Sequence, residues 1–95
     1  MKNAVKFETV LKDHLSDPTL AAQYLTACLD EGPDVFLQGL RDVVEARGGM
    51  ARTAQRAKVN REHLYRQLSP RGNPSLQSLE SLLPALGLKL SIVAG

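Results

Sequence analysis

Side chains that can hydrogen-bond to nucleobases or hold phosphate groups are concentrated between residues 52 and 73. Six of the seven Lys and Arg residues in the second half of the chain lie between Arg52 and Arg71. Arginine can bind guanine through two parallel hydrogen bonds, and other polar side chains can read base edges. Cations and polar loop residues can also hold phosphates, which fixes register without reading sequence. The stretch therefore suggests DNA recognition, although a charge-rich helix face is often only a solvated surface.

Two short predicted helices, residues 50–57 and 60–69, would position these side chains. In the second helix, Leu64 and Leu68 are four residues apart, which predicts one buried face. Val59 lies in the short turn and can fill the gap between the helices. Two short helices with a tight turn and small residues at their crossing are the components of a helix-turn-helix. The small residues recur every third position in the first helix: Ala51, Ala54 and Ala57.

The polar side chains of the second helix lie on the side opposite its two leucines when residues are placed 100° apart. We predict that this face enters a DNA major groove. The predicted base contacts are Asn60, which is also expected to cap this helix, Arg61, Glu62, Tyr65 and Arg66. The predicted phosphate contacts come from the first helix and from the loop after the second: Arg52, Gln55, Arg56, Ser69, Arg71 and Asn73.

Helix breakers and apolar periodicity divide the rest of the chain into helices. Asp17 followed by Pro18 is typical of a helix start, Gly32 of its end, and Pro33 begins another helix. Ser75 is expected to cap a last helix, which Pro84 should kink or end early. Residues 7–15 fit a short first helix. Three apolar stripes are predicted to face the core: Leu20, Ala21, Tyr24, Leu25, Cys28 and Leu29; then Val35, Phe36, Leu40, Val43 and Val44; and then Leu76, Leu79, Leu82, Leu83 and Leu86.

The C-terminal residues alternate Leu88, Leu90 and Ile92 with other positions, which predicts a short strand over 88–93. A lone strand needs a partner, and the simplest partner is a second copy of the chain. We therefore expect a homodimer joined through this strand. The predicted fold is one all-α domain over residues 1–95, with about five helices, an N-terminal helical extension, a helix-turn-helix at about 49–69, and this C-terminal β-strand.

Composition excludes several other classes of protein. The single cysteine, Cys28, cannot form an internal disulfide, and the first residues lack the apolar segment of a secretion signal. No apolar run is long enough to cross a bilayer, so we expect a cytoplasmic protein without a membrane partner. His14, His63 and Cys28 do not make a metal site. No catalytic set or phosphate-binding glycine loop stands out, so we expect no enzyme, metal or cofactor.

The run GGMARTAQRAKVNREHLYRQLSPRGNPSLQSLESLLPALGLKL resembles the lambda-repressor/Cro-type helix-turn-helix of small bacterial addiction-module antidotes. It is most similar to the HigA-like "probable addiction module antidote" group, and the resemblance covers roughly residues 17–93. It implies a dimer that binds the operator of its own operon and neutralises a RelE-like ribonuclease toxin. The chain departs from the pattern in having Lys58 where the turn often has glycine, and Gln67 where an apolar residue is common.

Charge is unevenly placed along the chain, which indicates two different partners. Residues 1–47 carry a net charge of −3, and residues 48–95 carry +5. A ribonuclease must present cations to RNA, and an inhibitor can cover them with carboxylates, which also speeds encounter. The predicted contacts to a basic toxin are Asp13, Asp17, Asp30, Glu31 and Asp34. These residues could equally be helix-terminal charges that complement the helix dipole.

Two alternatives to a DNA-binding antitoxin remain open on the sequence. One is a stand-alone transcriptional regulator of phage or mobile-element origin, without a toxin partner. The other is a protein-interaction inhibitor that does not bind DNA, which Lys58 in the turn keeps open.

Overall fold

The computed structural model describes residues 10–95, and this part of the chain is helical without strands. Its complete helices are α2 (Pro18–Glu31), α3 (Pro33–Ala46), α4 (Met50–Ala57), α5 (Arg61–Gln67) and α6 (Leu76–Ala85). Residues 10–15 are also helical, whereas the predicted contribution of Phe7 to this segment lies outside the described residues. The all-α prediction is therefore confirmed for the part of the chain that is described.

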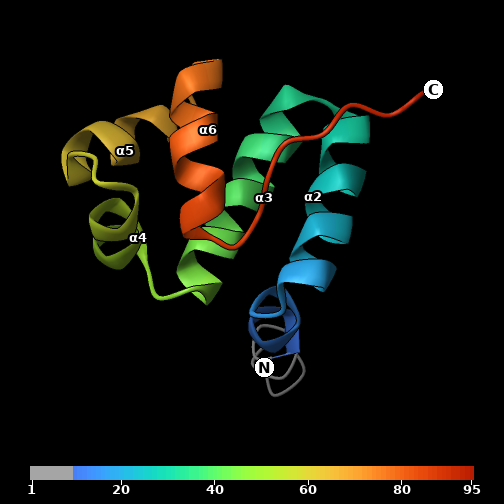
Figure 1. Ribbon diagram of the computed structural model, residues 1–95, viewed down its shortest axis with the longest axis horizontal. Coiled ribbons are helices and arrows are strands. Elements are labelled where there is room, and N and C mark those ends of the chain that lie inside the picture. Colours follow the sequence, from blue (N-terminus) through green and yellow to red (C-terminus); the bar gives the residue numbers. More distant parts are fainter. Residues whose placement is uncertain (1–9) are drawn as a thin grey trace.

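Helices α2 and α3 form an antiparallel pair (Figure 1). The side chain of Asp17 caps α2 as predicted, because it accepts hydrogen bonds from the backbone N–H groups of Thr19 and Leu20, at 2.8 and 3.3 Å. Gly32 separates the two helices and Pro33 begins α3, also as predicted. The helices approach closely at Gly39, where an added Cβ atom would lie 2.8 Å from the Cys28 Sγ atom.

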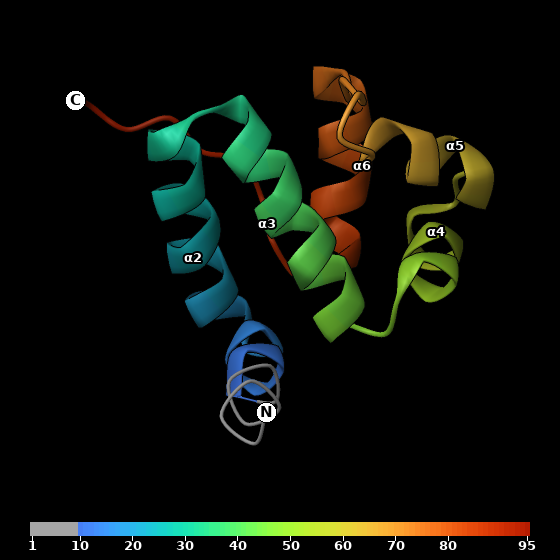
Figure 2. The same cartoon turned by 180° about the vertical axis from the view of Figure 1, so that it is seen from behind.

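The two short helices α4 and α5 lie on the opposite side of the molecule from α2. Both Figure 1 and Figure 2 show α3 and α6 between them. α4 packs against both α5 and α6. The acidic helix α2 and the basic pair α4 and α5 thus lie on opposite sides of the described structure.

One apolar core joins these helices, and α3 contributes four of its side chains. The buried apolar residues are Leu15, Ala21, Leu25, Leu37, Leu40, Val43, Val44, Ala54, Leu64, Leu68, Leu82, Leu83 and Leu86. The prediction is wrong for Leu29 and Leu76, which are 55% and 65% exposed. Leu29 lies at the edge of the stripe on α2, which packs chiefly against α3 and so buries a narrow face. Leu76 lies in the first turn of α6, before that helix reaches the core.

The end of α6 explains how the C-terminal residues leave the core. The N–H groups of Gly87 and Leu88 donate to the carbonyl oxygens of Pro84 and Leu83, at 3.0 and 2.8 Å. With Gly87 at a φ of 77°, this is a Schellman motif, and α6 ends one residue after Pro84. The helix therefore continues past Pro84 and ends at the glycine motif, so the early end predicted from this proline is not seen.

The predicted C-terminal strand over 88–93 is wrong for the single chain. Leu88 still packs against the core, but residues 89–95 make no backbone–backbone hydrogen bond to the rest of the described chain. Ile92 is fully exposed. A strand is defined by its pairing, and these residues have no neighbouring segment with which to pair.

Candidate nucleic-acid interface

The turn between α4 and α5 keeps a regular geometry although it lacks glycine. Lys58 has φ 58° and ψ 43°, which is the left-handed conformation that glycine adopts most readily. The N–H groups of Lys58 and Val59 donate to the carbonyl oxygens of Gln55 and Ala54, at 3.3 and 3.0 Å. This is again the Schellman pattern, with a lysine in the glycine position. The departure at Lys58 therefore costs backbone strain but leaves the turn intact.

The contact between α4 and the core differs in part from the predicted alanine seam. Ala54 is 3% exposed and Ala57 is half-buried, but Ala51 is exposed. The fully buried residue of α4 is instead Thr53, whose Oγ1 atom has no hydrogen-bond partner in the described structure. The seam follows the helix period through positions 53, 54 and 57, because a spacing of three residues drifts around a helix of 3.6 residues per turn.

Helix α5 begins where the sequence predicts. The Oδ1 atom of Asn60 accepts a hydrogen bond from the His63 N–H group at 2.9 Å, so this oxygen is already used as the helix cap. The amide NH2 group of Asn60 remains for any outside partner. Glu62 in the first turn and Arg66 in the last turn both complement the helix dipole.

The exposed face of α5 contains the residues predicted to contact bases. Leu64 and Leu68 are 2% and 0% exposed, whereas Tyr65 is 65% exposed. Arg61, Glu62 and Arg66 are exposed as well. The structure thus separates an apolar face from a polar face as the spacing predicted, and the role of the polar face in base contacts stays a prediction.

The predicted phosphate contacts surround this face from two sides. Arg52, Gln55 and Arg56 are exposed on α4, and Arg71 and Asn73 are exposed in the loop after α5. Ser69 differs from the others, because it is half-buried and its hydroxyl group donates to the Arg66 carbonyl oxygen at 2.7 Å. Its Oγ atom can therefore only accept from a further partner, whereas a phosphate contact requires a donor.

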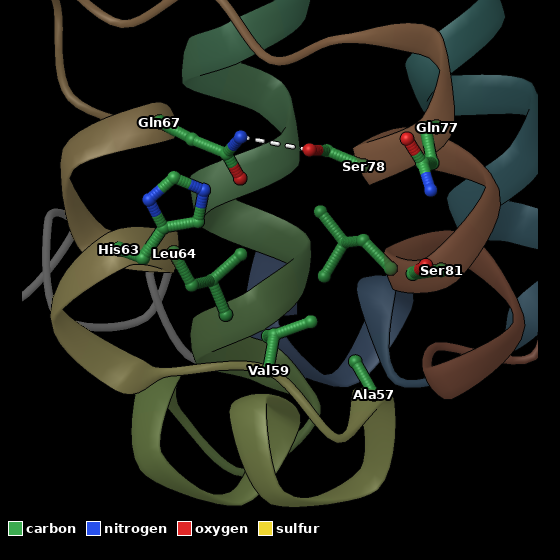
Figure 3. Close-up of a pocket in the computed structure, with 9 residues that line it drawn as sticks. Ala57, Val59, His63, Leu64, Gln67, Gln77, Ser78 and Ser81 are labelled. Carbon is green, nitrogen blue, oxygen red and sulfur yellow. Dashed lines mark hydrogen bonds between the residues drawn. The ribbon is translucent and has the colours of Figure 1, made fainter.

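Two side chains hold the C-terminal end of α5, and the sequence analysis assigned this role to neither of them. The guanidinium group of Arg41 on α3 donates to the carbonyl oxygen of Leu68. The Nε2 atom of Gln67 donates to the Oγ atom of Ser78 on α6 at 2.7 Å (Figure 3). The one signal in the sequence was the polar Gln67 at a position that the resemblance makes apolar.

The predicted toxin contacts do not form one patch. Asp13 lies in the helical segment before α2 and Asp17 at the start of α2, whereas Asp30, Glu31 and Asp34 lie around the turn from α2 to α3. A helix of this length separates the two groups by about 20 Å. The side chain of Asp17 is used as a cap, and Asp34 lies in the first turn of α3. The helix-terminal interpretation thus describes the positions of these two residues.

Tyr24 and Asp42 form a polar contact between α2 and α3. The Tyr24 hydroxyl group donates to the Asp42 Oδ2 atom at 3.0 Å. Burial, and then the hydrogen bond to Asp42, raise the pKa of Tyr24 well above its usual range. Burial also raises the pKa of the Cys28 thiol, so that the reactive thiolate is disfavoured.

Residues 10–95 include no helix that is both long and apolar enough to cross a membrane. In the same residues, no group of three or more His, Cys, Asp and Glu side chains is placed to hold a metal ion.

Comparison with known proteins places the chain in a family. Residues 3–94 match the family model described as "Probable addiction module antidote protein". An uncharacterized protein of Haemophilus influenzae is 32% identical over 81 residues, which cover 84% of this chain and 82% of the relative. No solved structure matches significantly. Because the family model covers nearly the whole chain, the protein belongs to the family of probable addiction module antidote proteins.

Proposed function

We propose that this protein is the antitoxin of an addiction module and represses its own operon by binding double-stranded DNA through a helix-turn-helix formed by α4 and α5. The observation that carries this proposal is that α5 is amphipathic. Leu64 and the following Leu68 are buried, whereas the opposite face exposes Arg61, Glu62, Tyr65 and Arg66. Helices of this kind enter the major groove and read base edges with their exposed side chains. The regular turn at Lys58 also supports DNA binding, because Lys58 was the feature that favoured an inhibitor without DNA binding, and the turn keeps its regular geometry.

The distribution of charge supports two separate binding surfaces. Six cations lie between residues 52 and 71, on and around α4 and α5. Residues 13–40 carry five carboxylates and neither Lys nor Arg. DNA would thus bind on the side of α4 and α5, and a basic ribonuclease-type toxin, which we propose to be RelE-like, would bind on the side of α2. Asp30, Glu31 and Asp34 form the larger group of these carboxylates, and they adjoin an exposed apolar residue, Leu29.

The exposed C-terminal residues support the proposal of a homodimer. Leu90, Ile92 and Val93 are 46%, 100% and 81% exposed, which is costly for a protein that remains a monomer. Pairing of residues 89–93 with the same residues of a second copy would satisfy their backbone groups. A two-fold dimer would then read an operator with two related half-sites.

DNA binding is tested by fluorescence anisotropy with a duplex from upstream of the protein's own gene and with a scrambled duplex. Arg61→Ala and Arg66→Ala should each weaken binding to the upstream duplex by about tenfold or more. Arg52→Ala should weaken binding to both duplexes equally and reduce the salt slope by about one. Lys12→Ala is the control, since this exposed cation lies in the helical segment before α2, away from α4 and α5. Equal affinity of the wild type for both duplexes would refute sequence-specific repression.

Toxin neutralisation is tested with the small basic protein that we expect a neighbouring reading frame to encode. The triple variant Asp30→Lys, Glu31→Lys and Asp34→Lys should lose inhibition of the purified ribonuclease, because it places cations against a basic surface. Asp13→Lys is the matched control in the helical segment before α2. Full inhibition by the triple variant would exclude this surface, and inhibition with no DNA binding would favour the protein-interaction inhibitor.

A further inference from the structure

We propose that Gln67, through its hydrogen bond to Ser78, is a positioning residue that sets the rotation of α5 and thereby its discrimination between DNA sequences. This inference rests on the proposed DNA-binding function and adds a residue that points away from the polar face. The observations that carry it are the weak attachment of α5, a hollow beside it, and the hydrogen bond that spans this hollow.

Helix α5 is short, and besides its packing on α4 it is attached to the core along one line. It has seven residues, and its buried side chains, Leu64 and the following Leu68, are four residues apart on the same face. No Cα atom of α5 lies within 8 Å of a Cα atom of α6. Two anchors on one line fix the depth of a helix well, but they resist its rotation about that line poorly.

The side of α5 that faces α6 is not filled by apolar packing. A groove of about 200 Å³ lies there, and Figure 3 shows side chains of α5 and α6 on its two walls. Leu64 and Leu82 contribute apolar surface to the groove, and no charged Lys, Arg, Asp or Glu side chain lines it. Because the groove is hollow, no van der Waals contact with α6 prevents α5 from rotating about its own axis toward α6.

The hydrogen bond from Gln67 to Ser78 crosses this groove, as the dashed line in Figure 3 shows. Its acceptor is itself held in place, because the Ser78 Oγ atom also lies 3.0 Å from the Oγ atom of Ser75. Ser75 caps α6 by accepting from the Ser78 N–H group at 3.0 Å. Gln67 therefore reaches a fixed point on α6, while Arg41 holds the adjacent carbonyl group of Leu68 to α3.

The expected consequence concerns base recognition rather than general affinity. A roll of about 20° would move the tip of an outward side chain such as Arg66 by about 2 Å, given the radius of a helix with its side chains. Recognition geometries tolerate errors of only about 0.5 Å or 10–20°. Phosphate contacts from α4 would be unaffected, since α4 is held by its own packing against α6.

The test compares four single variants on the same groove and the double variant of Gln67 and Ser78. Gln67→Leu and Ser78→Ala remove the hydrogen bond, and Ser78→Ala keeps the backbone N–H group that donates to Ser75, the cap of α6. Gln77→Leu and Ser81→Ala are matched controls, because both side chains line the groove without a recorded hydrogen bond across it. Anisotropy with the upstream and scrambled duplexes at two salt concentrations gives the affinity ratio and the salt slope. Thermal unfolding of each variant accompanies these measurements.

We expect Gln67→Leu and Ser78→Ala each to lower the ratio of upstream to scrambled affinity by about tenfold, with an unchanged salt slope. The double variant should lose no more than either single variant, because both remove one interaction. Gln67→Leu should not lower the unfolding temperature, since leucine adds apolar contact inside the groove. A purely structural role of Gln67 would instead change stability and leave the ratio unchanged.

Failure of this inference differs from failure of the proposed function. A wild-type preference for the upstream duplex that Gln67→Leu retains would overturn the positioning role alone. Equal losses in Gln67→Leu and Gln77→Leu would also overturn it, because the effect would then belong to the groove and not to the hydrogen bond. A wild type without any preference would overturn the proposed DNA recognition and this inference together.

Discussion

The backbone of Gly72 lies against the carbonyl end of α5, so close to Gln67 that no side chain fits between them. A Cβ atom on Gly72 would come within 2.6 Å of the Arg66 carbonyl oxygen and closer still to that of Gln67. Gly72→Ala should therefore lower the free energy of unfolding by about 1–3 kcal/mol. Urea denaturation measures this loss. Asn73→Ala, at the exposed neighbouring position, should change stability by less than about 0.5 kcal/mol, and equal effects of both substitutions would contradict the close approach.

Lys58 is strained, because a residue with a Cβ atom occupies the left-handed conformation there. Glycine would remove a strain of about 1–2 kcal/mol, and its greater freedom in the unfolded chain would offset part of this gain. Lys58→Gly should thus raise the free energy of unfolding by up to about 1 kcal/mol, and with it the unfolding temperature by a few degrees. Lys58→Ala, which keeps a Cβ atom, is the control and should not stabilise the protein. A destabilised glycine variant would mean that the lysine side chain makes a stabilising contact.

Thr53 buries a hydroxyl group that has no hydrogen-bond partner in the described structure. Valine has nearly the same shape and buries no polar atom, so Thr53→Val should leave the free energy of unfolding unchanged or raise it by about 1 kcal/mol. Thr26→Val is a suitable comparison, because the Thr26 hydroxyl group is exposed and donates to the Ala22 carbonyl oxygen at 2.8 Å. Thermal unfolding of both variants tests this prediction. A clear loss of stability in Thr53→Val alone would show that the hydroxyl group has a partner.

Burial, with the hydrogen bond to Asp42, raises the pKa of Tyr24 above its usual value of about 10. The folded protein therefore holds this proton more tightly than the unfolded chain does. The resulting stabilisation is complete below about pH 10 and declines as the pH rises further. Urea denaturation at about pH 9 and about pH 11 should show a larger decline for the wild type than for Tyr24→Phe. A parallel decline in the two proteins would exclude Tyr24 as its source.

The exposed C-terminal residues should hold the proposed dimer together. A chain that ends at Leu88 keeps the Schellman motif and the contact of Leu88 with the core. It should therefore fold with the same unfolding cooperativity as the full chain but sediment as a monomer. Sedimentation velocity of both proteins measures this difference. A truncated protein that stays dimeric, or a full chain that is already monomeric, would refute pairing through residues 89–95.

The sequence by itself determined where helices begin and end. Asp17, Asn60 and Ser75 each cap the helix predicted for them, and Gly32 and Pro33 mark the boundary between α2 and α3. These signals are readable because a cap involves backbone groups two or three residues away. The placement of leucines and polar side chains on opposite faces of α5 was also predictable, because it follows from local helix geometry.

The tertiary structure alone decided which apolar residues are buried and what holds α5. Leu29 and Leu76 fit the helical period but are exposed, whereas Thr53 is buried, because burial depends on which neighbouring helix covers a face. The bonds from Gln67 to Ser78 and from Arg41 to Leu68 join residues 11 and 27 positions apart, which local spacing does not reveal. The C-terminal strand failed as a prediction for the single chain because the period of a strand is local, but its hydrogen bonds require a second segment.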